Sequence, residues 1–121
     1  MESIRQKQVG ELIRRQFSMV LIAEGQYVYG TKALVTVTQV MMSPDLALAK
    51  IYLSIFNIDN KQEVLHLLEE HYARLKQALH SRLKKQIRAM PEMKFYIDDT
   101  MDEVYKVEAL FKKFDTNTPN S

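Results

Sequence analysis

Two alternating stretches of residues, separated by a short turn, constrain the fold of this chain more than any other feature. From Ala33 to Met41 valine and threonine alternate, which is the period of a strand with one buried face. The chain then turns at Ser43-Pro44-Asp45. Beyond the turn, small and aliphatic residues share one face of a second strand: Ala47, Ala49, Ile51, Leu53 and Ile55. The two stretches predict an antiparallel hairpin, and its alanines leave room for a helix to pack closely against the sheet.

Helical periodicity precedes the hairpin. Ser3 and Gln6 form a capping-box pattern, and apolar residues then recur every three or four positions as far as Glu24. The pattern predicts a first helix from Ser3 to Glu24, followed by a loop that Gly25 and Gly30 bracket.

A longer helical pattern follows the hairpin, beginning at Asn60 and ending at Pro91. A straight helix of about thirty residues would span about 45 Å, more than a domain of this size is expected to cover with one rod. We therefore expect a kink or break near its middle. Glu92 to Asp98 alternates as a third strand, and Thr100 to Glu103 begins a last helix whose apolar stripe ends at Phe114.

The expected order is helix, strand, strand, broken helix, strand and helix. Three strands covered by helices make an α+β layer architecture, and the order up to the third strand matches the type II KH topology. We expect one KH-like domain over residues 1–115 and a disordered polar tail over residues 116–121. The chain has no cysteine, and no apolar run approaches the roughly 20 residues of a membrane span, so we expect a cytoplasmic protein without a membrane partner.

Charge is distributed unevenly along the chain, whose net charge is +2. From Arg74 to Lys94 seven residues are basic and only Glu92 is acidic, so this segment carries +6. The rest of the chain has ten basic and fourteen acidic residues and carries −4. We expect any polyanionic partner to meet the basic segment first.

Two blocks of sequence resemble the ribosome-binding factor A family. The first runs from Leu34 through Ser43-Pro44-Asp45 to Ser54, and the second is Ile87-Arg-Ala-Met-Pro-Glu-Met-Lys-Phe95 with Asp98-Asp99-Thr100 after it. The resemblance extends over nearly the whole chain. It implies a factor that binds the immature small (30S) ribosomal subunit and its 16S rRNA, assists maturation and rRNA processing, especially in the cold, and catalyses no reaction.

Glycine usage departs from the related patterns. KH domains clamp nucleic-acid backbones with a Gly-x-x-Gly loop, but the only glycines here are Gly10, Gly25 and Gly30, so the chain lacks that loop. Family members carry Ala-x-Gly at an interhelical kink, where this chain has His71-Tyr72-Ala73. Because all three residues can adopt ordinary helical dihedral angles, we expect the long helix to bend less sharply here than at a glycine.

The candidate RNA-binding residues lie mainly on the basic segment. A generic charged helix face is usually only solvated, but Arg82, Lys84 and Lys85 have no acid within the helix for i,i+4 pairing. We predict phosphate contacts from six residues of the segment: Arg74, Lys76, Arg82, Lys84, Lys85 and Arg88. Lys50 and Tyr52, on the outer strand face, are a second candidate through charge and stacking, although such pairs often only cover a sheet.

Other chemistry-bearing residues favour structural roles. The acids Asp98, Asp99, Asp102 and Glu103 stand where a helix dipole favours negative charge, and the three histidines lack the i,i+4 spacing of a metal site. We therefore predict no catalytic residue, metal or cofactor. The methionines are expected to fill the core.

We expect a monomer whose partners are the small subunit and 16S rRNA. The alternative is a protein interaction module that docks through its sheet edge or C-terminal helix.

Overall fold

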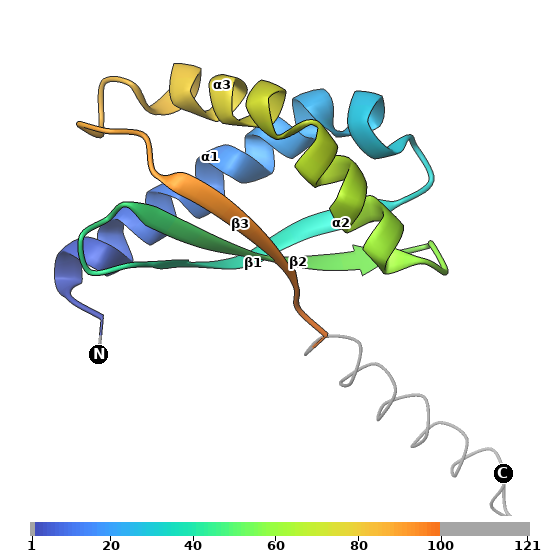
Figure 1. Ribbon diagram of the computed structural model, residues 1–121, viewed down its shortest axis with the longest axis horizontal. Coiled ribbons are helices and arrows are strands. Elements are labelled where there is room, and N and C mark those ends of the chain that lie inside the picture. The colour runs from blue at the N-terminus through green and yellow to red at the C-terminus, as the bar shows by residue number, and fades with distance from the viewer. Residues whose placement is uncertain (1, 100–121) are drawn as a thin grey trace, which may run out of the picture.

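The predicted hairpin forms the centre of the fold. The computed structural model describes residues 2–99, with the elements α1 (Ile4–Tyr29), β1 (Leu34–Met42), β2 (Leu48–Phe56), α2 (Lys61–Glu70), α3 (Tyr72–Leu83) and β3 (Glu92–Ile97). All three helices lie on one side of the sheet (Figure 1). The predicted α+β class and element order are confirmed over these residues. The predicted last helix and the polar tail lie outside the described residues.

The sheet has the strand order β1-β2-β3, which makes β2 the central strand. β1 pairs with β2 antiparallel, as the sequence predicted, and β3 pairs with β2 parallel. A parallel neighbour requires a crossover rather than a tight turn, and α2 and α3 supply it between β2 and β3. The turn between the hairpin strands is stabilised locally, because the Ser43 hydroxyl donates to Asp45 at 2.6 Å and the Ala47 amide donates to the same carboxylate at 3.1 Å.

A bulge in β1 interrupts the alternation that the sequence predicted. Val37 is opposite Leu53, but the next pair joins Gln39 to Tyr52, so Thr38 has no opposite residue. The inner face of β1 therefore shifts by one position beyond Val37, to Val40 and Met42, which are buried. The Thr38 hydroxyl donates to the Asp98 carboxylate at 2.6 Å, and this contact with the chain beyond β3 stabilises the bulge.

The inner face of β2 is as predicted, with one exception. Ala49, Ile51, Leu53 and Ile55 are buried, whereas Ala47 lies before the strand and is exposed. Ala47 belongs to the end of the turn. Its carbonyl accepts a hydrogen bond from the Glu92 amide, and this bond begins the parallel ladder with β3.

The first helix is longer than predicted. Gly25 lies inside α1 and is buried, so the expected loop between Gly25 and Gly30 is wrong. The added turn buries Val28 in the core, which outweighs the weak helix propensity of one glycine. The helix ends at Gly30, whose φ of 83° is a conformation that favours glycine.

The long helical pattern divides into α2 and α3 at His71. A break near its middle was predicted, but the expectation of a shallow bend in the absence of glycine is wrong, because a clear interruption separates the two helices. His71 has φ −99° and ψ 21°, values that residues other than glycine can adopt, so no glycine is needed for the break. The break lets the apolar faces of both helices contact one small core through buried leucines on either side, such as Leu68 and Leu75.

Candidate nucleic-acid interface

The predicted basic helix ends earlier than its sequence pattern. α3 stops at Leu83, Lys84 to Gln86 form a turn, and Arg88 lies in a bend. Both the Gln86 and the Ile87 amides donate to the Leu83 carbonyl, which tightens the end of the helix before the chain returns to the sheet at Pro91. The predicted continuation of the helix to Met90 is therefore wrong, and Lys84, Lys85 and Arg88 project from a turn and a loop.

Four of the predicted cations gather at this end of α3. They are exposed, and no ion pair within residues 2–99 involves them: Arg82, Lys84, Lys85 and Arg88. We call these four residues the basic surface. Like charges without a carboxylate partner repel one another, so this arrangement suits a polyanion that supplies several phosphates.

The other two cations of the segment are already paired. Arg74 donates from two of its nitrogens to one oxygen of Glu24, at 2.7 and 3.0 Å, and lies over the ring of Tyr27 at 5.2 Å. Lys76 donates to Glu92 at 2.9 Å. Both acids come from other elements, α1 and β3, which is why the sequence of the helix alone did not reveal them.

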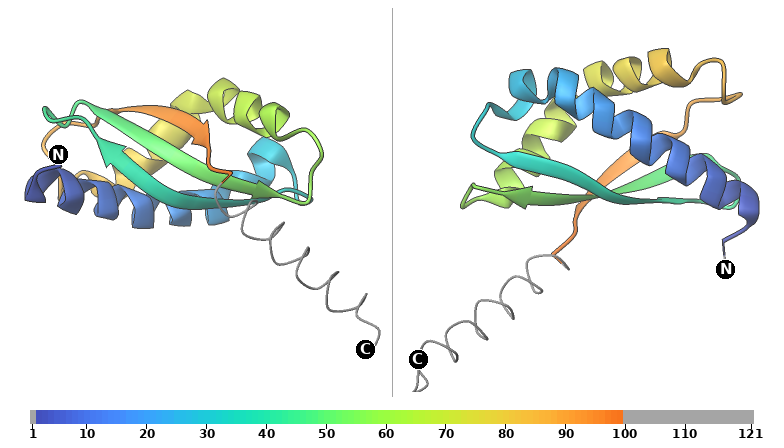
Figure 2. Two further views of the ribbon diagram at one scale, coloured as in Figure 1. Left: turned by 90° about the horizontal axis from the view of Figure 1, so that it is seen from below. Right: turned by 180° about the vertical axis from the view of Figure 1, so that it is seen from behind.

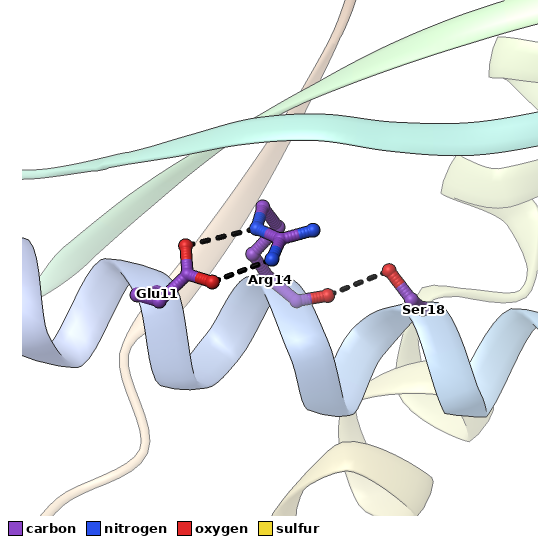
Figure 3. A network of polar contacts seen from close by, with 3 residues as sticks. All are labelled: Glu11, Arg14 and Ser18. Atoms are coloured by element: carbon purple, nitrogen blue, oxygen red, sulfur yellow. Dashed lines mark hydrogen bonds and ion pairs between the residues drawn. The ribbon is translucent and has the colours of Figure 1, made fainter.

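Arg14 on α1 is a further paired cation and illustrates the contrast. Its guanidinium donates to both oxygens of Glu11, one turn earlier on the same helix face, and Ser18 donates to the Arg14 carbonyl (Figure 3). The hydrogen bond from Arg14 lowers the pKa of Glu11, which keeps the carboxylate charged. A cation with its own carboxylate is less available to a phosphate than a member of the basic surface.

A groove adjoins the basic surface at Arg88. Its volume is about 730 Å³, and it lies between the first turns of α1, the β1–β2 turn and the loop before β3. Its lining is largely apolar, and its charged residues are two cations and two acids: Arg5, Arg88, Asp45 and Glu92. Arg5 could not be selected from the sequence, because nothing along the chain connects the start of α1 with the loop that holds Arg88.

Lys50 and Tyr52 lie on a different surface, the face of the sheet opposite the helices. The view from below in Figure 2 looks onto that face. Their neighbours on β3 are Lys94 and Tyr96, and the two tyrosine rings stack with centroids 5.3 Å apart. Lys94 and Tyr96 were not among the predicted RNA-binding residues. The alternation of β3 predicts that they face outward, but the parallel register that places them beside Lys50 and Tyr52 has no signal in the sequence.

Several of the acids and histidines considered as chemical candidates have structural contacts where the structure describes them. Asp98 accepts from Thr38, and Asp99 lies 3.8 Å from the Lys61 ammonium. His66 contacts Glu70 at 3.0 Å, and no group of three potential metal ligands occurs among residues 2–99. Asp102 and Glu103 lie outside the described residues. No helix of the described part is long and apolar enough to cross a bilayer.

Comparisons with known proteins agree on one family. The ribosome-binding factor A family model matches residues 5–111. A ribosome-binding factor A of Cytophaga hutchinsonii is 37% identical over 113 residues, which cover 93% of this chain and 84% of that protein. The same factor of Chlorobaculum tepidum is 31% identical over 111 residues, which cover 91% and 90% of the two chains.

Two structures of relatives share the fold. The crystal structure of ribosome-binding factor A from Thermus thermophilus has a TM-score of 0.64 at 22% identity, covering 76% of this chain and 94% of that chain. A homology model of the Thermus thermophilus factor, fitted into the cryo-EM map of a complex of that factor with 30S, has a TM-score of 0.55 at 25% identity, covering 72% and 92%. The family match spans most of the chain and its relatives are similar over most of their length, so this chain belongs to the ribosome-binding factor A family.

Proposed function

We propose that this chain is a cytoplasmic assembly factor that binds the immature small ribosomal subunit through 16S rRNA and assists its maturation and rRNA processing. It acts by binding and not by catalysis, since a factor that binds one conformation of the subunit better than another shifts the population toward it. The Thermus thermophilus relative, which was fitted into a map of its 30S complex, supports the choice of partner.

One observation carries the proposal, the four unpaired cations of the basic surface within the described chain. Arg82, Lys84 and Lys85 follow one another over a single turn at the end of α3, and Arg88 continues the set into the loop. RNA binding of this kind is dominated by phosphate contacts and counterion release. Arg74 and Lys76 contribute less in this proposal, because a phosphate would first have to displace Glu24 or Glu92.

The test reverses three charges of the basic surface: Lys84→Glu, Lys85→Glu and Arg88→Glu. Binding of the triple variant to immature small subunits should weaken, and the slope of log affinity against log salt should fall by about 0.7 to 0.9 for each lost phosphate contact. Binding measured at several salt concentrations checks both effects. The thermal unfolding of the variant should change little, because exposed charges away from packing shift stability by roughly 0.5 kcal/mol or less.

A matched control carries the same change in net charge elsewhere. Lys7, Arg15 and Lys32 are exposed and have no ion pair within the described part of the chain, so Lys7→Glu, Arg15→Glu and Lys32→Glu together separate a local from a global charge effect. Equal losses of subunit affinity in the two triple variants would show that the basic surface contributes only nonspecific electrostatic attraction. Wild-type affinity with an unchanged salt slope in the folded test variant would reject it as an RNA-binding surface.

The alternative function, a protein-docking module, is favoured by a specific feature of β3. This strand is an edge of the sheet, and a hollow of about 550 Å³ lies beside it, lined by residues of the start of α2 and by Tyr96 and Ile97. Docking of a protein here should depend little on salt. The salt series described above therefore distinguishes the two functions.

A further inference from the structure

The parallel pairing of β2 with β3 assembles a compact cluster on the open face of the sheet. Lys50 is the neighbour of Lys94, and Tyr52 is the neighbour of Tyr96. We call these four residues the tyrosine–lysine face. All four side chains point away from the helices, since the residues that alternate with them, such as Ile51 and Phe95, are buried in the core.

The two lysines form a like-charge pair on adjacent strands. Lys50 and Lys94 are exposed, and no carboxylate pairs with either one among residues 2–99. Like charges directly beside each other destabilise a sheet, so this pairing has an energetic cost, and no ion pair of the described fold offsets it. A phosphate between the two ammonium groups would offset it.

The two tyrosines offer an aromatic surface beside this charge. Their rings are stacked at an interplanar angle of 25°, and the Tyr96 residue is 37% exposed. No hydrogen bond of either hydroxyl to a described residue accompanies the stack. Gln39, which is exposed and opposite Tyr52 across the hairpin, places an amide donor and acceptor at the border of the same surface.

We propose that the tyrosine–lysine face binds a single-stranded segment of RNA, with a base stacked on the tyrosine pair and its phosphates near the two lysines. The inference rests on the proposed function, which makes rRNA the partner, and adds an unpaired strand as the kind of RNA bound. Aromatic side chains stack on bases that are not already stacked in a helix, whereas double-stranded RNA is recognised mainly by its shape and backbone. The lysine pair lies two residues along the strands from the tyrosine pair, so one face offers both positive charge for phosphates and rings for a base, as single-strand recognition requires.

The test compares single-stranded with duplex RNA on the full chain. Oligouridylate and oligoadenylate of about eight nucleotides serve as single strands, and a duplex of equal length serves as the reference, with binding followed by fluorescence anisotropy. The single strands should bind more tightly than the duplex. Tyr52→Leu and Tyr96→Leu keep an apolar side chain but remove the ring, and each should lower the single-strand affinity by roughly 5- to 100-fold. Lys50→Glu with Lys94→Glu should weaken binding and reduce its salt slope.

A tyrosine elsewhere provides the matched control. Tyr27 is 68% exposed and belongs to α1, which lies on the other side of the sheet (Figure 1), so Tyr27→Leu should leave single-strand binding at the tyrosine–lysine face unchanged. Circular dichroism and thermal unfolding establish that each variant is folded. In a two-dimensional NMR spectrum of the wild type, the ring signals of Tyr52 and Tyr96 should shift on titration with the single strand.

Three outcomes would overturn the inference. The first is an absence of single-strand binding by the wild type, and the second is unchanged affinity in folded Tyr52→Leu and Tyr96→Leu variants. The third is loss of subunit binding in these variants when RNA oligonucleotides neither bind nor compete, which would assign the face to a protein. The proposed function is tested separately by the charge reversals at the basic surface, so a failure here with a positive result there leaves the assembly role standing.

Discussion

Gly10 lies where α1 passes close to the backbone of β1. A Cβ at this position would lie 2.7 Å from the Val40 carbonyl oxygen, inside ordinary contact distance, and the obstructing atom belongs to the backbone of β1. Gly25, further along the same helix, meets the end of the Tyr29 side chain instead. The two glycines thus share a helix and differ in what a methyl group would displace.

This difference predicts unequal losses of stability for two alanine substitutions. Each gains up to about 1 kcal/mol of helix propensity. In Gly10→Ala the gain is outweighed by the displacement of a paired strand, and a net loss of about 1 to 3 kcal/mol is expected. In Gly25→Ala the half-buried Tyr29 ring can swing aside, so the loss should be smaller. Urea unfolding of both variants checks the order, and an equally stable Gly10→Ala protein would contradict the close approach.

Leu53 tests which face of β2 is the core. Its side chain is fully buried opposite Val37, so Leu53→Ala should destabilise the fold by roughly 2 to 5 kcal/mol. Leu34, at the start of β1, is 56% exposed and provides the control, since Leu34→Ala should change stability by about 0.5 kcal/mol or less. The midpoint of chemical denaturation measures both, and a wild-type midpoint for Leu53→Ala would refute the assigned facing.

At the scale of elements, one side chain holds α3 to the edge of the sheet. The Tyr72 hydroxyl donates to the Glu92 carboxylate at 2.6 Å and accepts from the Met93 amide at 2.8 Å, while Lys76 donates to the other oxygen of Glu92. The Met93 amide faces the free edge of β3, so Tyr72 also covers part of an edge that would otherwise be open to pairing with another chain.

Tyr72→Phe should therefore loosen this junction. Loss of the hydroxyl leaves the Met93 amide without its partner and is expected to cost about 1 kcal/mol, with faster hydrogen exchange at that amide. The Tyr72 hydrogen bond is the main cause of the lowered pKa of Glu92, ahead of Lys76, so the pKa of Glu92 should rise in the variant. A lowered folded-state pKa stabilises the fold above the unfolded pKa of the carboxyl, and this stabilisation is lost as the pH falls through the lowered value.

NMR titration of the Glu92 carboxyl and unfolding in mild acid measure both effects. The variant should lose less stability than the wild type as the pH falls through this range, because less stabilisation is left to titrate. Tyr27→Phe, at an exposed tyrosine, is the control and should leave the pKa of Glu92 where it is. An unchanged Glu92 pKa in Tyr72→Phe would contradict the contact.

Local pattern predicted the elements, and contacts between elements decided where the prediction failed. The alternation of β2 identified Ile51, Leu53 and Ile55 as core because the period of a strand is a property of its own residues. The bulge at Thr38 depends on Asp98, sixty positions away. The break at His71 arises because the apolar faces of two helices must contact one core. The helix propensity of His71 does not predict this break.

For the whole molecule, the candidate site was only partly predictable for the same reason. The concentration of positive charge was visible in the sequence, and four of its members are exposed and have no ion pair in the described chain. The pairing of Arg74 with Glu24 requires α1 and α3 to lie together. The addition of Lys94 and Tyr96 to the open face requires a parallel register that only the folded sheet defines.

The position of β3 also has a consequence for the order in which the molecule comes apart. β1 and β2 are joined by a short turn, whereas β3 reaches β2 only after the chain has crossed through residues 57–91, so its docking closes a much longer loop. An edge strand with one neighbour is a natural unit of local opening. Because Lys50 and Tyr52 belong to the hairpin and Lys94 and Tyr96 to β3, a ligand bound across them recognises only the docked state. By mass action such a ligand stabilises the docked state. RNA bound to the tyrosine–lysine face would therefore keep β3 paired with β2.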